Sequence, residues 1–139
     1  MKLKLSIVNL IVGLLSGMKL NKVADKDIKT TLINDYIYLR RLVKQPREDK
    51  DEIASKFQSD WRDDFVAVES LRREKKPVVG YDKYLLAEAD ANKAISDLFS
   101  VEVEVLVKSV PMNDFLAVLD GEEMNLEQIA LLQEAGVIE

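Results

Sequence analysis

Three carboxylates near the middle of the chain are the densest group of potential metal ligands. They are Asp60, Asp63 and Asp64, and they surround Trp61. On a continuous helix Asp60 and Asp64 share a face, because residues four apart are neighbours there. Metal sites in helical bundles normally combine Glu with a Glu-x-x-His motif, and the sequence has no His. We therefore interpret the cluster as a solvated acidic face and predict no metal. A metal-assisted reaction at Asp60 and Asp64 is the one enzymatic alternative.

The residue types that carry most enzyme chemistry are missing. The 139 residues include no His and no Cys, so the commonest general base and the thiolate nucleophile are both absent. No glycine-rich phosphate loop, nucleophile elbow, zinc-ligand spacing or dinucleotide fingerprint occurs. The sequence thus predicts a protein that is not an enzyme and has no cofactor.

A basic run could instead contact phosphate groups. It consists of Arg72, Arg73, Lys75 and Lys76, interrupted by Glu74. Specific nucleic-acid binding also needs groups that read or stack on bases. The acidic residues that follow disfavour a broad nucleic-acid footprint. Cations at the end of a predicted helix stabilise its dipole, and this is the role we expect.

The first 20 residues combine basic and apolar character. Lys2 and Lys4 precede an apolar run, but the run is too short for a membrane span and lacks a good cleavage site. We therefore predict neither a membrane span nor a cleaved signal peptide. Ser6 is the expected cap of a helix from Ile7 to about Gly17. This helix is apolar around most of its circumference, which is typical of a central or interface helix. The candidate contact residues here are Ile7, Leu10 and Leu14, and Trp61 is a candidate core or interface anchor.

A strand is predicted late in the chain, over residues 101–108. Alternating valines give it one apolar face, while Glu102 and Glu104 lie on the other. Its expected partner is Met1–Leu5, which places these two acids opposite Lys2 and Lys4. Both acids are therefore further candidate contact residues.

The intervening residues 25–99 predict a long antiparallel helical hairpin. Asp25 is the expected cap of a helix over residues 27–44, and Pro46 is expected to break or kink it. Helix should resume by residue 49 or 51 and end at Pro77, before another helix over residues 81–99. The first of these helices carries an apolar stripe of Ile28, Leu32, Ile33, Tyr36, Ile37, Leu39 and Val43.

The tail predicts a short helix over residues 112–119, a turn at Asp120 and Gly121, and a last helix to about Ala135. Asn125 and Gln128 form a capping-box pattern at its start, and Gly136 is the expected stop. The fold class is therefore mainly α, with α+β character from a two-stranded ribbon. We predict a single domain over residues 1–139, made of segments 1–20, 25–99 and 100–139.

Charge is distributed unevenly along the chain. Residues 1–46 carry nine Lys and Arg against three Asp and Glu, a net of +6, whereas residues 77–139 carry three against thirteen, a net of −10. Such segments can face each other within one fold or form separate solvated faces. Alternatively they join neighbouring subunits head to tail, which generates rings or filaments.

The order of features resembles a group of small phage-encoded helical proteins of unknown function. The resemblance lies in the start MKLKLSIVNLIVGLL, the helix with Tyr38-Leu39-Arg40-Arg41, the EVEV strand at Glu102–Val105 and the ending LEQIALLQEAGVIE. It implies a phage or prophage origin, hence the host cytoplasm or the virion, and no particular activity. Our leading hypothesis is an oligomeric assembly protein that contacts itself or other phage proteins. The alternative is a small regulator that binds a host protein or nucleic acid through Arg72–Lys76.

Overall fold

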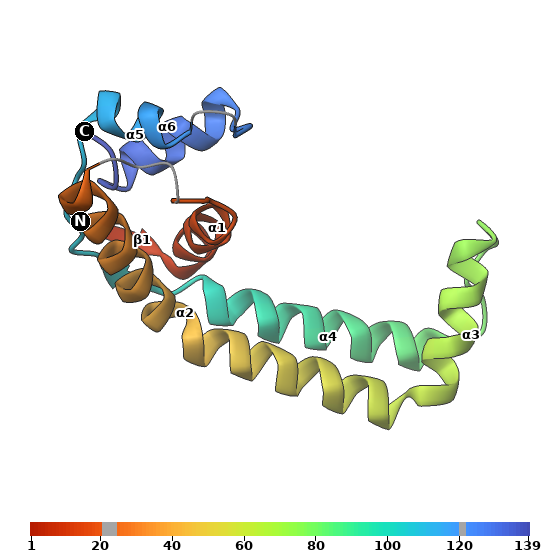
Figure 1. Cartoon of the computed structure of the whole chain (residues 1–139). Coiled ribbons are helices and arrows are strands. Elements are labelled where there is room, and N and C mark those ends of the chain that lie inside the picture. The colour runs from red at the N-terminus through yellow and green to blue at the C-terminus, as the bar shows by residue number, and fades with distance from the viewer. Residues whose placement is uncertain (21–24, 120–121) are drawn as a thin grey trace. The chain divides into compact units, whose positions relative to one another are not determined.

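The chain is mainly α-helical, with a small β-ribbon, as the sequence predicts. The computed structural model describes residues 1–20, 25–119 and 122–139 (Figure 1). The predicted turn at Asp120 and Gly121 lies outside these residues. The elements are β1 (Lys2–Lys4), α1 (Leu5–Ser16), α2 (Lys26–Asp60), α3 (Arg62–Arg73), α4 (Asp82–Phe99), β2 (Glu102–Glu104), α5 (Met112–Val118) and α6 (Leu126–Glu134).

Contacts within the chain divide it into two compact units. The first unit comprises Met1–Lys44 and Val101–Glu139, and the second unit comprises Gln45–Ser100. The two ends of the chain therefore fold together, and the second unit is an insertion between them. Helix α2 contributes its first part to the first unit and its remainder to the second.

The predicted pairing of the two strands is confirmed, although each strand has only three residues. β1 and β2 are antiparallel, with Lys2 opposite Glu104 and Lys4 opposite Glu102. Backbone bonds extend the pairing by one residue at each end, from Val105 N to Met1 O (2.7 Å) and from Leu5 N to Val101 O (2.9 Å). The expected lysine–glutamate ion pairs do not form within the described residues. Instead the α-ammonium of Met1 lies 2.7 Å from Glu104 Oε1.

Side chains from both ends of the chain form the core of the first unit. Helix α1 buries one face and packs against α6. The C-terminus is held by a parallel bridge between Val110 and Ile138, with Glu139 N donating to Val110 O at 2.9 Å. The fully buried core residues include Val8, Ile11, Leu39, Val43, Val110, Phe115, Leu132, Val137 and Ile138.

Of the two effects expected at Pro46, a break or a kink, the break does not occur, because α2 runs through this residue. A proline within a helix costs one backbone hydrogen bond, and it can be tolerated where both flanking segments are otherwise stabilised. Here Gln45 Nε2 donates to Asp49 Oδ1 at 2.8 Å, across the position of the proline. The boundary between the two units nevertheless lies at Lys44 and Gln45, immediately before Pro46.

The chain leaves the helix at Trp61 instead, which the sequence did not predict. Trp61 has φ −121° and ψ 32°, and α3 starts directly after it. Asp60 and Asp64 therefore belong to different helices and do not share a helical face. The next helix also ends earlier than expected, at Arg73, and Lys75 takes a positive φ of 57°.

Most predicted helix ends are confirmed. Asp25 Oδ1 accepts hydrogen bonds from the backbone of Asp27 (2.8 Å) and Ile28 (3.3 Å). Asn125 and Gln128 form the full capping box. Gly136 follows α6 with φ 83°, a conformation that glycine adopts without strain. The expected Ser6 cap is wrong, because α1 begins at Leu5 and Lys4 occupies the cap position without a side-chain hydrogen bond.

The second unit is a helical hairpin closed by aromatic rings. The part of α2 after residue 45 lies beside α4, and the two run antiparallel (Figure 1). Tyr84 joins them, because its ring lies 5.3 Å from that of Phe57 and 6.1 Å from that of Trp61. Tyr84 and Val68 are the fully buried side chains of this unit.

Candidate functional site

A polar cleft in the first unit lies between the start of α2 and the segment that follows β2. Its volume is about 460 Å³. Small-molecule sites usually have volumes of ~300–1,000 Å³ but are mainly apolar. Here most of the lining residues have polar side chains, and they are Asp27, Thr30, Thr31, Asn34, Asp35, Tyr38, Leu106 and Lys108.

Two side chains of α2 fix the segment that forms one wall of the cleft. Asp35 Oδ1 accepts a hydrogen bond from the backbone N–H of Lys108 at 3.0 Å. The Tyr38 hydroxyl donates to Glu104 O (3.4 Å) and accepts from Leu106 N (3.2 Å). These bonds satisfy backbone groups just where the β-ribbon ends. They explain why the predicted strand over residues 101–108 ends at Glu104. Backbone groups of Glu104, Leu106 and Lys108 form hydrogen bonds with side chains of α2 instead of with β1.

Asp35 is an unusual residue for a helix face that packs on a core. It is 5% exposed, and its Oδ2 has no hydrogen-bond partner among the described residues. Burial raises the pKa of this carboxyl group, and the hydrogen bond from Lys108 and its charge oppose that rise. A catalytic hydroxyl activated by Asp35 would be hydrogen-bonded to it. Among the described residues, neither threonine of the cleft donates a hydrogen bond to Asp35.

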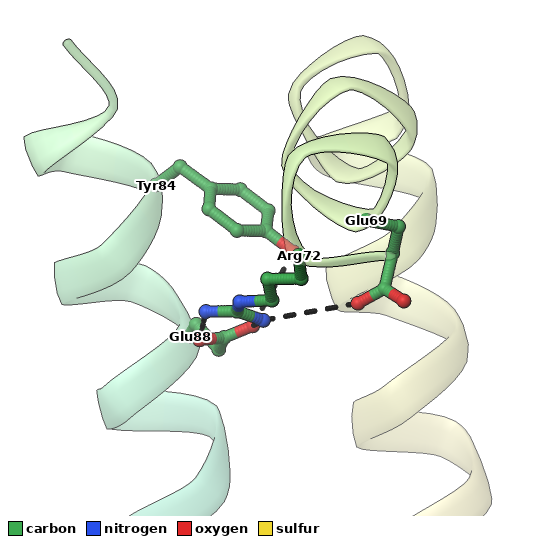
Figure 2. Close-up of polar contacts among 4 residues, drawn as sticks. All are labelled: Glu69, Arg72, Tyr84 and Glu88. Carbon is green, nitrogen blue, oxygen red and sulfur yellow. Dashed lines mark hydrogen bonds and ion pairs between the residues drawn. The ribbon is translucent and has the colours of Figure 1, made fainter. Parts of the chain in front are cut away.

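A second polar cluster joins α3 to α4 in the second unit (Figure 2). The Arg72 guanidinium donates two hydrogen bonds to Glu88, Nη2 to Oε1 at 2.8 Å and Nη1 to Oε2 at 2.9 Å. Tyr84 Oη donates to Glu88 Oε2 at 3.4 Å, and Glu69 Oε1 lies 3.7 Å from Arg72 Nη1. The arginine is thus held between carboxylates from two helices, in the bidentate geometry that such pairs prefer.

The pKa values in this cluster shift as the pairing requires. The hydrogen bonds from Arg72 lower the pKa of Glu88, and those bonds raise the pKa of Arg72. Burial is the main cause that raises the pKa of Tyr84. Both charged partners are therefore stabilised in their ionised forms. The cluster fixes α3 on α4, and it leaves Arg72 without the unpaired charge that a phosphate would need.

The other cations of the basic run differ in whether they form an ion pair. Lys76 Nζ pairs with Glu74 at 2.8 Å. Arg73 and Lys75 form no ion pair with any described residue and are exposed. Of the four candidate contact residues, Arg72 and Lys76 are therefore neutralised by neighbouring acids.

A shallow depression of about 360 Å³ lies around Asp60, Trp61, Asp63 and Asp64, but no group of three or more potential ligands within the described residues could hold a metal ion.

The apolar candidates on α1 lie on the less buried side of that helix. Leu10 is 57% exposed, and Ile7 and Leu14 are half-buried. The buried residues of the helix include Val8, Ile11 and Leu15. Helix α1 therefore packs on the core with one face only.

Within the described residues, no helix combines the length and apolar character needed to cross a membrane.

The first part of α2 carries an exposed face that sequence reasoning placed in the core. Ile33 and Ile37 are 40% and 41% exposed, although both fitted the predicted apolar stripe. The buried face consists of Leu32, Asp35, Leu39 and Val43 instead. Residues at spacings of three and four share a helix face. The isoleucines thus share theirs, here named the basic α2 face, with four cations: Lys26, Lys29, Arg40 and Lys44.

Two of these features had a signal in the sequence. The predicted stripe of α2 held seven apolar residues, more than one face of a helix needs, so a second apolar face could have been inferred. Asp35 is three residues after Leu32 and four before Leu39, which puts a carboxylate on the buried face. Its contact with Lys108, by contrast, had no local signal.

No protein family model, curated protein or solved structure matches this chain. Function must therefore be argued from the described surfaces and clusters themselves.

Proposed function

We propose that this chain is a non-enzymatic protein that acts by binding other protein chains, as a component of an assembly. The basic α2 face is its contact surface. The observation that carries the proposal is the exposure of Ile33 and Ile37 between two pairs of cations on a helix whose other side is packed on the core. The sequence resemblance supports a phage-type assembly, in the host cell or in the particle.

The arrangement of this face fits protein contact better than the alternatives. Protein interfaces combine an apolar centre with a polar rim. The isoleucines supply the centre, and Lys26, Lys29, Arg40 and Lys44 supply the rim. Sequence-specific nucleic-acid binding would need aromatic or amide groups beside the cations, and the exposed face offers aliphatic side chains.

The polar cleft does not favour an enzymatic function. Its most buried carboxylate, Asp35, is bonded to the backbone of Lys108 and has no hydroxyl partner. The regulatory alternative, in which Arg72–Lys76 binds nucleic acid, loses support because Glu88 occupies Arg72.

Site-specific photocrosslinking in the cells that naturally make the chain tests this proposal. A crosslinking amino acid replaces Ile37, and a matched control replaces the exposed Leu86 in the second unit. We expect a protein adduct from position 37 that is absent or much weaker from position 86, with the crosslinked protein identified by mass spectrometry. Adducts only to lipid or nucleic acid, or equal yields from both positions, would overturn the proposal.

A further inference from the structure

A second exposed face in the first unit complements the basic α2 face. On α6, Leu126 is 84% exposed, and Glu127, Ala130 and Glu134 are exposed on the same side of the helix. Their spacings of three and four, with Glu127 beside Leu126, keep them together. We name this set the acidic α6 face. It has an apolar centre and a rim of the opposite charge.

The two faces do not neutralise each other within the chain. Within the described residues, no ion pair joins Lys26, Lys29, Arg40 or Lys44 of the basic α2 face to Glu127 or Glu134 of the acidic α6 face. Both faces lie in the first unit, where Lys26, Arg40 and Lys44 on one and Glu127 and Glu134 on the other are exposed to a partner at the same time.

We infer that a second copy of this chain covers the basic α2 face with its acidic α6 face. This inference rests on the proposed function and names its partner. Ile33 and Ile37 of one copy pack against Leu126 and Ala130 of the next, while Arg40 and Lys44 approach Glu127 and Glu134. Charge complementarity chooses this partner over an anionic membrane or a nucleic acid, because the chain itself carries the matching acidic and apolar surface.

The proposed contact is heterologous, because it joins two different faces. When two copies bind, one keeps its acidic face free and the other keeps its basic face free. Such contacts extend into open chains or close into rings. Exposed ion pairs are screened by salt, so association should weaken at high ionic strength.

Charge reversal with sedimentation velocity analysis tests the inference on the full chain. One variant carries Arg40→Glu and Lys44→Glu, and a second carries Glu127→Lys and Glu134→Lys. A matched control carries Lys50→Glu and Lys56→Glu, which reverse two exposed lysines of α2 in the second unit. Circular dichroism verifies that all variants keep their helical content.

We expect association only where a basic face of one copy can meet an acidic face of another. The wild type and the control associate with rising concentration, and each reversed variant stays monomeric, with association at least tenfold weaker. Mixing the two reversed variants restores association, because the acidified α2 face of one matches the basic α6 face of the other. A single chain that carries all four reversals also associates again.

Other outcomes overturn the inference without ambiguity. A wild type that stays monomeric at all concentrations and at low salt, or a mixture that does not recover, excludes the proposed contact. The crosslinking experiment then separates this failure from that of the proposed function. An adduct from position 37 to a different protein keeps the function and rejects the second copy, whereas no protein adduct rejects both.

Discussion

The two units reach stability in different ways. The first unit buries apolar side chains from both ends of the chain, on α1, α2, α5, α6 and the segments around them. The structure describes every residue of the second unit, and Val68 and Tyr84 are its only fully buried side chains. Stability from burial scales with the apolar area removed from water. The first unit therefore has a packed core, whereas the second is a helical hairpin in which the rings around Tyr84 and the Arg72–Glu88 pair join the helices.

The two units also differ in the direction in which a carboxylate pKa is shifted. Asp35 in the first unit is buried beside apolar side chains, and burial raises its pKa. Glu88 in the second unit is held by Arg72, and that hydrogen-bonded cation lowers its pKa. One carboxylate thus costs stability when it ionises, and the other contributes stability when it ionises. Four substitutions test this contrast.

The largest effect is expected from Phe115→Ala. Phe115 is fully buried in the first unit, and truncation of a buried Phe typically costs ~3–5 kcal/mol through lost burial and a residual cavity. Chemical denaturation followed by circular dichroism measures the loss of unfolding free energy. Hydrogen exchange should show that amides of α1 and α6 lose protection more than those of α4. Equal losses in both units would contradict the contrast between them.

Tyr84→Ala should give the next largest effect, confined to the second unit. The ring of Tyr84 contacts Phe57 and Trp61, and little else in this unit is fully buried. We expect a loss of about 2–4 kcal/mol, somewhat below that for Phe115 because the thinner hairpin can collapse around the gap. Trp61 is the only tryptophan, so its fluorescence reports this unit. The matched control is Tyr81→Ala, which removes a half-buried tyrosine one turn earlier and should cost much less.

The elements that local pattern controls could be predicted from the sequence. The alternation of apolar and charged residues predicts the register of Lys2 and Lys4 against the acids of β2, since a shift by one residue would move them to the other face. Caps at Asp25 and Asn125 and the stop at Gly136 depend on side chains a few residues away, so they too were predictable.

Features that depend on tertiary packing could not be predicted in this way. Helix α2 passes through Pro46 and ends just before Trp61, whose ring packs on Tyr84 more than twenty residues later. The end of β2 is set by Tyr38 and Asp35, from a helix far earlier in the chain. The exposure of candidate contact residues could not be predicted for the same reason. The pattern showed that Ile33 and Ile37 are apolar, and the packed structure was needed to show that the core does not use them.

Asp35→Asn should stabilise the first unit by on the order of 1 kcal/mol at neutral pH. The amide oxygen can still accept the hydrogen bond from Lys108, and the cost of a buried, unpaired charged oxygen disappears. Because the pKa of Asp35 is raised in the folded state, its stability contribution is full below the ordinary value of 3.8 and is lost as pH rises through the raised value. The advantage of Asn over Asp should therefore grow with pH. Asp27→Asn, at an exposed position of the same cleft, is the control and should show little change. Loss of stability at pH 7 from Asp35→Asn would mean that the carboxylate has a partner in solution.

The smallest effect is expected from Glu88→Gln, and its pH dependence has the opposite sign. The amide cannot form the charged bidentate pair with Arg72, so the second unit loses a contact between α3 and α4. The pair lies partly in solvent, so the loss should be below that of the other three variants. Since the pKa of Glu88 is lowered in the folded state, its contribution is present above the ordinary value of 4.5 and disappears as pH falls through the lowered value. Wild type and variant should then converge in acid, whereas the two forms at position 35 diverge as pH rises. A double-mutant cycle with Arg72→Met isolates the pair, and a coupling that does not change with pH would show that Glu88 acts through packing rather than charge.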